Sequence, residues 1–184
     1  MGIKELFSAI FTLLFRYRKF WRDLKEAAPE AEFNVLKDYA APVIAIVQIA
    51  KFPLIGQPRP AMIFAIANFL IDIAALYLMM GGAAYLLSRE RSERIKAGMV
   101  TIFCYSMTPV WIFELFYFTG SWSWLFAFLA LSYALVIAKN GLAVMLDFEV
   151  AVPVNVLRNT ALFVVTVNTS VFLLIRAVMR LFNF

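Results

Sequence analysis

The sequence contains no histidine, and it contains a single cysteine, Cys104. The absence of histidine excludes imidazole metal sites, Ser-His-Asp triads and histidine general bases. One cysteine forms no internal disulfide, and Cys104 lies in an apolar stretch rather than in a Cys-x-x-Cys pair, so we interpret it as a buried packing residue. From these absences we expect no metal, no cofactor and no enzymatic activity.

Charged residues are also scarce, because they make up 16% of the 184 residues while hydrophobic residues make up 64%, with a mean hydropathy of +0.83. Soluble domains are about 45–50% apolar and about 25% charged. The excess here is too large for one globular core, which predicts an integral membrane protein and excludes a water-soluble enzyme. The net charge of +5 then indicates basic loops facing the cytoplasm rather than nucleic-acid binding.

Five apolar segments are each long enough to cross the bilayer, whose hydrocarbon core takes about 20 helical residues. They cover about residues 36–55, 61–87, 97–118, 122–145 and 160–180. The end of the fourth stays open between Ala138 and Leu146, because Lys139 either stops it or snorkels through its last turn. We predict that the connections between the spans are residues 52–60, 88–96, 119–121 and 147–159. We therefore predict an all-α bundle of five transmembrane helices that forms one membrane domain over residues 36–184.

Residues 1–35 are predicted to form an amphipathic segment. Apolar residues recur at helical spacing, at Leu6, Phe7, Ile10, Leu13, Leu14, Tyr17, Phe20, Trp21 and Leu24. A basic cluster gathers towards its end, at Arg16, Arg18, Lys19, Arg22 and Lys25. The continuous apolar run, residues 6–15, precedes these charges and is too short to span the bilayer. A cleaved signal has its positive charges first, so the pattern is not that of a cleaved signal. The helix either lies on the membrane surface, with its cations facing anionic lipid headgroups, or packs on the protein's own spans.

The basic residues predict the orientation. If the N-terminus is cytoplasmic, thirteen of the seventeen Lys and Arg residues fall on that side, and only Lys51, Arg59, Arg176 and Arg180 fall on the other. The positive-inside rule then favours a multi-pass protein of the cell (inner) membrane with its N-terminus in the cytoplasm and its C-terminus outside. An aromatic cluster around the uncharged turn at 119–121 is typical of the outer interface, and it comprises Trp111, Phe116, Tyr117, Phe118, Trp122 and Trp124.

At this level of detail the sequence resembles the Yip domain family, multi-span membrane proteins of the Ypt/Rab-interacting type. The resemblance rests on residues 96–109 with a Tyr-Ser-Met-Thr-Pro core at 105–109, on the aromatic turn, and on Lys-Asn-Gly-Leu at 139–142. An acidic patch at Glu26, Glu30 and Glu32, and a first span that opens with Tyr-Ala-Ala-Pro at 39–42, are similar to the bacterial and archaeal members.

The resemblance implies a compact prokaryotic-type member that organises membrane or binds protein or lipid partners without catalysis. Eukaryotic members are Golgi and endoplasmic-reticulum proteins associated with small GTPases, and they carry a longer cytosolic region with an Asp-Leu-Tyr-Gly-Pro motif. That region and that motif are absent here. A small GTPase partner is therefore not implied for this chain.

Polar residues within the spans are the candidate site. Asp72 lies near the middle of the second span, where an acidic residue costs about 2.5–3.5 kcal/mol on insertion scales. Asn68 lies one turn earlier on the same helical face. With residues on three other spans they form a predicted polar layer of Asn68, Asp72, Gln48, Tyr105 and Asn168. Such a layer is typical of a transport or proton-relay site, and somewhat more often of interhelical hydrogen bonding with a protonated Asp72.

A second group lies nearer the outer face. Lys51, Glu114 and Arg176 each lie about one turn from the outer end of a span, so opposite charges at matched depth are expected to pair. The alternative for the two cations is snorkelling into the headgroups, which a short acidic side chain such as Glu114 does poorly.

Two function classes remain. Intramembrane aspartyl proteolysis needs two facing acids, and Asp72 has no intramembrane Asp partner because Asp147 belongs to an inner connection. We therefore expect either a membrane-organising, partner-binding protein or a transporter or channel for a small solute, ion or lipid. Five spans make a thin wall around a pathway, so transport would require a homo-oligomer.

Overall fold

The structure, a computed structural model, describes residues 2–27, 34–87, 93–145 and 154–181, and within these ranges it contains helices and no strand. The elements are α1 (Ile3–Glu26), η1 (Leu36–Ala40), α2 (Ala41–Ala50), α3 (Phe52–Ile55), α4 (Pro58–Leu87), α5 (Glu93–Ser106), α6 (Thr108–Phe113), η3 (Glu114–Phe118), η4 (Gly120–Trp122), α7 (Ser123–Met145) and α8 (Val154–Leu181).

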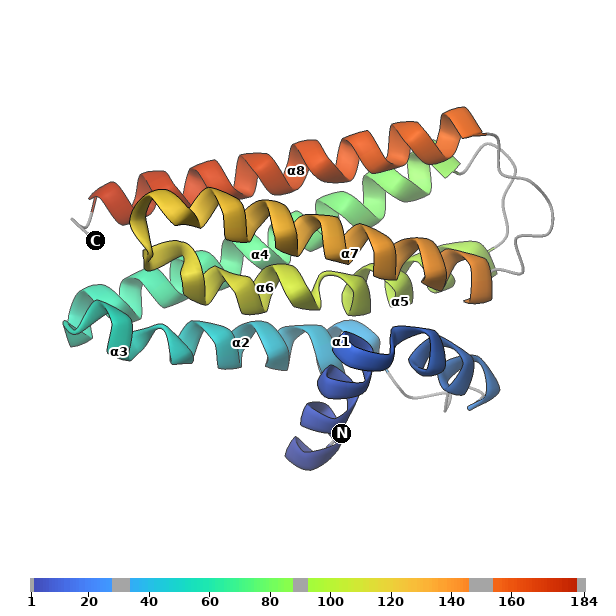
Figure 1. Ribbon diagram of the computed structural model, residues 1–184, viewed down its shortest axis with the longest axis horizontal. Helices are drawn as coiled ribbons and strands as arrows, with labels where there is room; N and C mark the ends of the chain where they lie inside the picture. The colour runs from blue at the N-terminus through green and yellow to red at the C-terminus, as the bar shows by residue number, and fades with distance from the viewer. Residues whose placement is uncertain (1, 28–33, 88–92, 146–153, 182–184) are drawn as a thin grey trace.

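Five segments of the described chain are long and apolar enough to cross a membrane, and they run side by side as an elongated bundle (Figure 1). They are Leu36–Ile55, Pro58–Ala83, Gly98–Phe118, Gly120–Met145 and Arg158–Leu181. The predicted all-α bundle is therefore confirmed, and the protein is a multi-pass membrane protein. The C-terminal end of α8 lies at one end of the bundle, and α4 ends and α5 begins at the opposite end.

The start of the second span differs from the predicted one, and the end of the fourth span, which the sequence left open, lies at residue 145 as in the longer alternative. The second helix begins at Pro58 and not at residue 61, because Pro58 and Pro60 lie in its first turn, where a missing backbone N–H breaks no hydrogen bond. The fourth helix continues through Lys139 to Met145. Within this last part of the helix, Nδ2 of Asn140 donates to the carbonyl oxygen of Val136 at 2.8 Å.

Some predicted features lie outside the described residues. These are the acidic residues Glu30 and Glu32, the basic residues Arg89 and Arg91, and Asp147.

The third span is interrupted between α5 and α6, where Pro109 follows Thr108. Proline has no N–H, so the carbonyl of Tyr105 loses its usual helical donor. The hydroxyl of Thr108 replaces it, donating to that carbonyl at 2.7 Å, and the Tyr39 hydroxyl lies 2.8 Å from the Thr108 oxygen. Because Thr108 has donated its proton, Tyr39 must donate here. The Tyr-Ser-Met-Thr-Pro run is thus a hydrogen-bonded helix break.

The aromatic residues near the turn at 119–121 divide into two groups. Trp122 and Trp124 are exposed, as expected for an interfacial belt, whereas Trp111 and Tyr117 are buried inside the bundle. Hydropathy alone does not separate these groups, because aromatic side chains suit both a membrane interface and a packed core.

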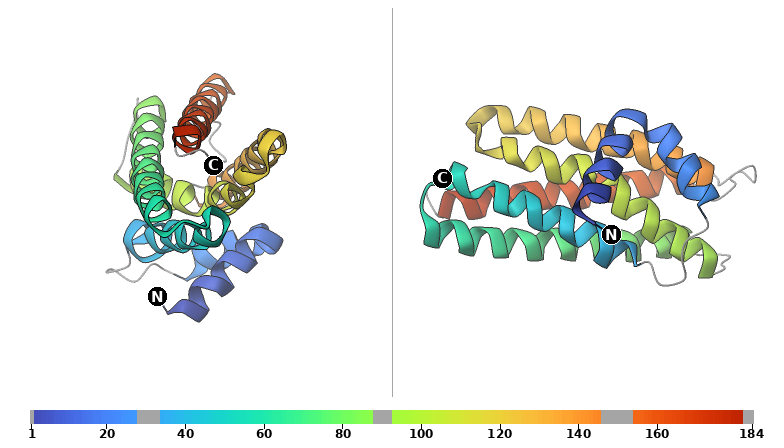
Figure 2. Two further views of the ribbon diagram at one scale, coloured as in Figure 1. Left: turned by 90° about the vertical axis from the view of Figure 1, so that its left-hand side faces the viewer. Right: turned by 90° about the horizontal axis from the view of Figure 1, so that it is seen from below.

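The N-terminal helix α1 bends at Arg16, whose φ of −140° and ψ of 43° are not helical. Its second half lies along the bundle, and its first half turns away and crosses the bundle side (Figures 1 and 2). Tyr133 of α7 contacts the chain beside the bend, because its hydroxyl donates to the carbonyl oxygen of Leu14, two residues before Arg16.

Candidate functional site

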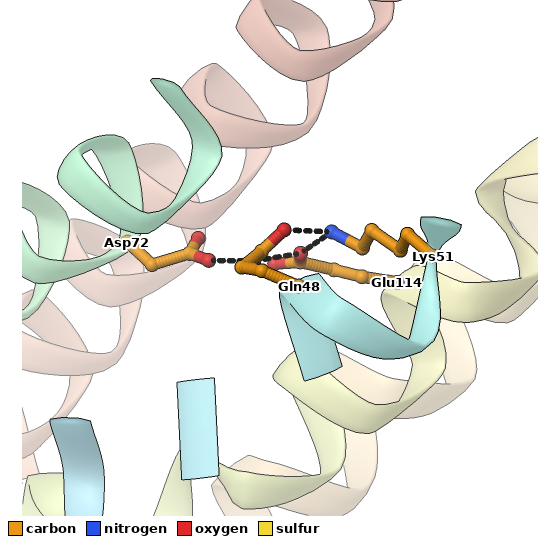
Figure 3. Close-up of polar contacts among 4 residues, drawn as sticks. All are labelled: Gln48, Lys51, Asp72 and Glu114. Atoms are coloured by element: carbon orange, nitrogen blue, oxygen red, sulfur yellow. Dashed lines mark hydrogen bonds and ion pairs between the residues drawn. The ribbon is translucent and has the colours of Figure 1, made fainter. Parts of the chain in front are cut away.

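Four buried polar side chains from three spans form one hydrogen-bonded cluster (Figure 3). They are Gln48 of α2, Lys51 just after it, Asp72 of α4 and Glu114 at the start of η3, and we call them the polar cluster. Each is at most 3% exposed. Polar groups removed from water in this way must find partners within the protein.

Gln48 joins the two acids of the polar cluster. Its Nε2 donates to Oδ2 of Asp72 at 2.8 Å and lies 3.4 Å from Oε2 of Glu114. Its Oε1 accepts a hydrogen bond from Nζ of Lys51 at 2.9 Å. Gln48 and Lys51 are three residues apart, so both side chains leave α2 on the same face.

Lys51 and Glu114 form the ion pair of the polar cluster, with 2.5 Å between Nζ and Oε2. Nζ also lies 5.8 Å from the centre of the Phe64 ring, within range of a cation–π interaction. The polar cluster holds two carboxyl groups and one ammonium group, so it is electrically neutral only when one of the carboxyl groups carries a proton. Charge balance therefore couples Asp72 to Glu114 through Gln48 and Lys51.

Asn68 lies one turn from Asp72 and is 0% exposed. Both its Nδ2 and its Oδ1 are buried without a hydrogen-bond partner among the residues that the structure describes. An unpartnered buried amide is costly, at about 1–3 kcal/mol. Asn68 therefore adds unused hydrogen-bonding capacity one turn from the polar cluster.

The structure does not bring all predicted site residues together. Arg176 donates to the Gly120 carbonyl and to the Ser123 hydroxyl, at 2.9 and 2.8 Å, rather than to Glu114. Nδ2 of Asn168 donates to the Val164 carbonyl at 2.9 Å and lies 3.1 Å from the sulfur of Met79.

Tyr105 is in a different environment again, in an aromatic group with Tyr39, Phe20 and Trp21. The predicted pair of Lys51 and Glu114 is thus present, and it joins Gln48 and Asp72 of the predicted layer in one four-residue cluster. Tyr105, Asn168 and Arg176 lie elsewhere. Residue counting from span ends predicts the depth of a side chain, but it does not predict the direction in which the helix presents it.

A second site lies where α1 docks on α7, and Gly141 is its central residue. A Cβ atom on Gly141 would lie 2.7 Å from Cζ2 of Trp21, so only glycine admits the indole this closely. Nε1 of Trp21 donates to the carbonyl oxygen of Ile137 at 3.1 Å. Together with Tyr133, these residues occur every four positions along α7, and therefore form one docking face.

The docked helix has a further apolar face that the bundle does not cover. Leu6 and Leu13 are buried against the protein, whereas a neighbouring row is 54–74% exposed. This row comprises Ile3, Phe7, Phe11 and Phe15, and we call it the outer stripe. Its members are four residues apart, so they share one helical face. The basic residues Arg16, Arg18, Lys19, Arg22 and Lys25 are exposed as well.

Sequence reasoning found part of these sites. It identified the amphipathic helix and Phe7, but it did not separate the outer stripe from the docking face, and it did not assign Gly141 to the contact with Trp21. The four-residue spacing of residues 3, 7, 11 and 15 was visible in the sequence and was the available signal.

Comparisons with known proteins found no match among protein-family models, curated proteins or solved structures.

Proposed function

We propose that this protein is a non-enzymatic membrane protein that binds lipid through α1 and thereby organises the bilayer beside its bundle. One observation carries the proposal: α1 is fixed to α7 by one face while the outer stripe points away from the protein. A helix that served only to complete the core would not require three exposed phenylalanines. The same class of function is what a compact Yip domain protein, proposed from the sequence motifs alone, would have.

The energetics favour insertion of the outer stripe into lipid. Complete burial of a large apolar side chain contributes about 1.5–3 kcal/mol. Half burial of four such side chains therefore contributes on the order of 5 kcal/mol. Each exposed basic residue near an anionic surface adds about 1 kcal/mol, so electrostatics supplements hydrophobic insertion and selects anionic lipid.

Docking gives α1 a property that a free amphipathic peptide lacks. The contact of Trp21 with Gly141 holds the first half of α1 across the bundle side (Figure 2). The outer stripe then enters one leaflet at a fixed position beside the spans and displaces lipid there. We propose that this leaflet is the cytoplasmic one, with the N-terminus inside and the C-terminus outside, because the basic residues divide thirteen to four in that sense.

Reconstitution of the full chain into vesicles of phosphatidylglycerol and phosphatidylcholine tests the proposal. We expect vesicles with the wild-type chain to differ from protein-free vesicles in the distribution of diameters seen by electron microscopy. The reason is that insertion of the outer stripe into one leaflet expands that leaflet. A triple Phe7→Ser, Phe11→Ser, Phe15→Ser variant should lose this effect. The control variant Ser8→Ala, on the polar face, should behave as the wild type. Equal distributions for the wild type and the triple variant would contradict the proposal.

A transporter or channel for a small solute or ion is the alternative function, and the polar cluster is the observation that favours it. An intramembrane carboxylate in contact with a cation and a second acid resembles a proton or cation site. Against it, the four side chains are nearly fully buried and hydrogen-bonded to one another. That arrangement is typical of a structural cluster that joins three spans, and so we place transport second.

A further inference from the structure

A half-open apolar cavity of ≈ 220 Å³ lies between α5, α7 and α8. Figure 1 shows α7 and α8 diverging towards the end of the bundle where α5 begins, and the cavity lies in this divergent part. Its volume exceeds that of an engineered apolar cavity of about 150 Å³ that binds benzene. A ligand of several methylene groups therefore has space here.

The lining is apolar with two exceptions. Ile102, Leu135 and Val164 represent the apolar walls, one from each helix. The exceptions are Lys139 of α7 and Thr160 of α8, which also line the cavity. An apolar chain with one polar, negatively charged end would complement these walls.

Each of the two polar residues can still form an ion pair or a hydrogen bond with a ligand. Within the described part of the chain, Lys139 has no ion-pair partner. Thr160 is 6% exposed, and its hydroxyl has no hydrogen-bond partner among the described residues. A buried hydroxyl and an unpaired ammonium group at one cavity both favour an oxygen-rich anionic ligand group.

We propose that this cavity binds one acyl chain of an anionic phospholipid, with the phosphate near Lys139 and an ester or phosphate oxygen accepting from Thr160. The lining residues belong to membrane-spanning segments, so the ligand reaches the cavity from the bilayer. A partner helix is about 10–12 Å across and does not fit this volume. The cavity does not include α1, so this inference is independent of the function proposed for α1.

Photo-crosslinking tests the site. The full chain is reconstituted with phosphatidylglycerol that carries a diazirine in one acyl chain, and the adducts are mapped by mass spectrometry. We expect adducts on cavity residues of α5, α7 and α8. Ala161→Phe, which fills the cavity, should abolish them, whereas Leu162→Phe, at the exposed neighbouring position, should leave them unchanged. Thermal unfolding of both variants checks that each is folded.

The charge requirement is tested separately. Lys139→Gln should reduce cavity labelling by phosphatidylglycerol about fivefold, while Arg180→Gln at the other end of the bundle should not. Diazirine phosphatidylcholine should label the cavity as weakly as phosphatidylglycerol labels the Lys139→Gln variant. If the adducts on the cavity residues persist in the Ala161→Phe variant, the acyl chain does not bind in this cavity. Equal labelling by the two lipids, unchanged by Lys139→Gln, would overturn the preference for anionic lipid.

Discussion

The indole of Trp21 lies against the backbone of Gly141, at a distance that leaves no room for a methyl group on the glycine. This contact joins the N-terminal helix to the fourth span, 120 positions later in the chain. It determines whether α1 is a fixed part of the protein or a tethered amphipathic segment.

Gly141→Ala should therefore undock α1. The added methyl group would displace Trp21 and weaken its hydrogen bond to Ile137. We expect faster amide hydrogen exchange in α1, by about tenfold or more, with the spans still protected. Gly81→Ala is the matched control, because nothing lies within 4 Å of its added Cβ and alanine favours a helix by about 1 kcal/mol. Unchanged exchange in Gly141→Ala would show that the contact does not hold α1.

The two acids of the polar cluster should respond differently to neutralisation. Glu114→Gln removes the ion-pair partner of Lys51 and should cost about 3–5 kcal/mol of unfolding free energy, as for other broken buried pairs. Asp72→Asn leaves the pair of Lys51 and Glu114 intact and should cost less than about 1.5 kcal/mol. Unfolding in detergent measures both. Equal losses, or a larger loss for Asp72→Asn, would contradict the role given to Lys51.

The absence of transport is the expected outcome of a flux assay. A closed polar cluster supports no pathway, so vesicles that contain the wild-type chain should show the same proton and potassium leak as empty vesicles and as Asp72→Asn vesicles. A flux that the wild type carries and folded Asp72→Asn lacks would establish the transport alternative and place Asp72 on the pathway.

The proposed orientation predicts opposite locations for two reporter fusions. A reporter after Lys96 should be cytoplasmic, and one after Phe184 should lie outside, because three spans follow the connection at residues 88–96 and an odd number of crossings ends on the opposite side. If both reporters are cytoplasmic, the five spans are not all inserted as proposed.

Hydropathy predicted the bundle well because the bilayer imposes a minimum length on every span, and five apolar runs met it. The pairing partners of Lys51 and Arg176 were harder to predict. Both lie near the end of a span, and the choice of Glu114 by Lys51 depends on helix rotation, which span boundaries do not contain. Likewise, the position of Gln48 between Asp72 and Glu114 follows from how α2, α4 and η3 meet.

The two arrangements left open for the N-terminal helix illustrate a second limit. An apolar period shows that a helix has an apolar face, but it does not show whether protein or lipid covers it. In α1, Leu13 packs on the protein while Phe11, two residues earlier, is exposed. Only the bend at Arg16 and the docking of Trp21 separate these faces, and both depend on α7.

The depth of residue 11 in the bilayer tests the central proposal most directly. A nitroxide label is attached to Phe11→Cys, or to Ser8→Cys on the polar face, in a Cys104→Ala background of the reconstituted full chain. We predict that the label at position 11 collides mainly with oxygen, which concentrates in hydrocarbon, and that the label at position 8 collides mainly with a water-soluble nickel chelate. Equal access of the chelate to both positions would contradict insertion of the outer stripe, and with it the proposed function of α1.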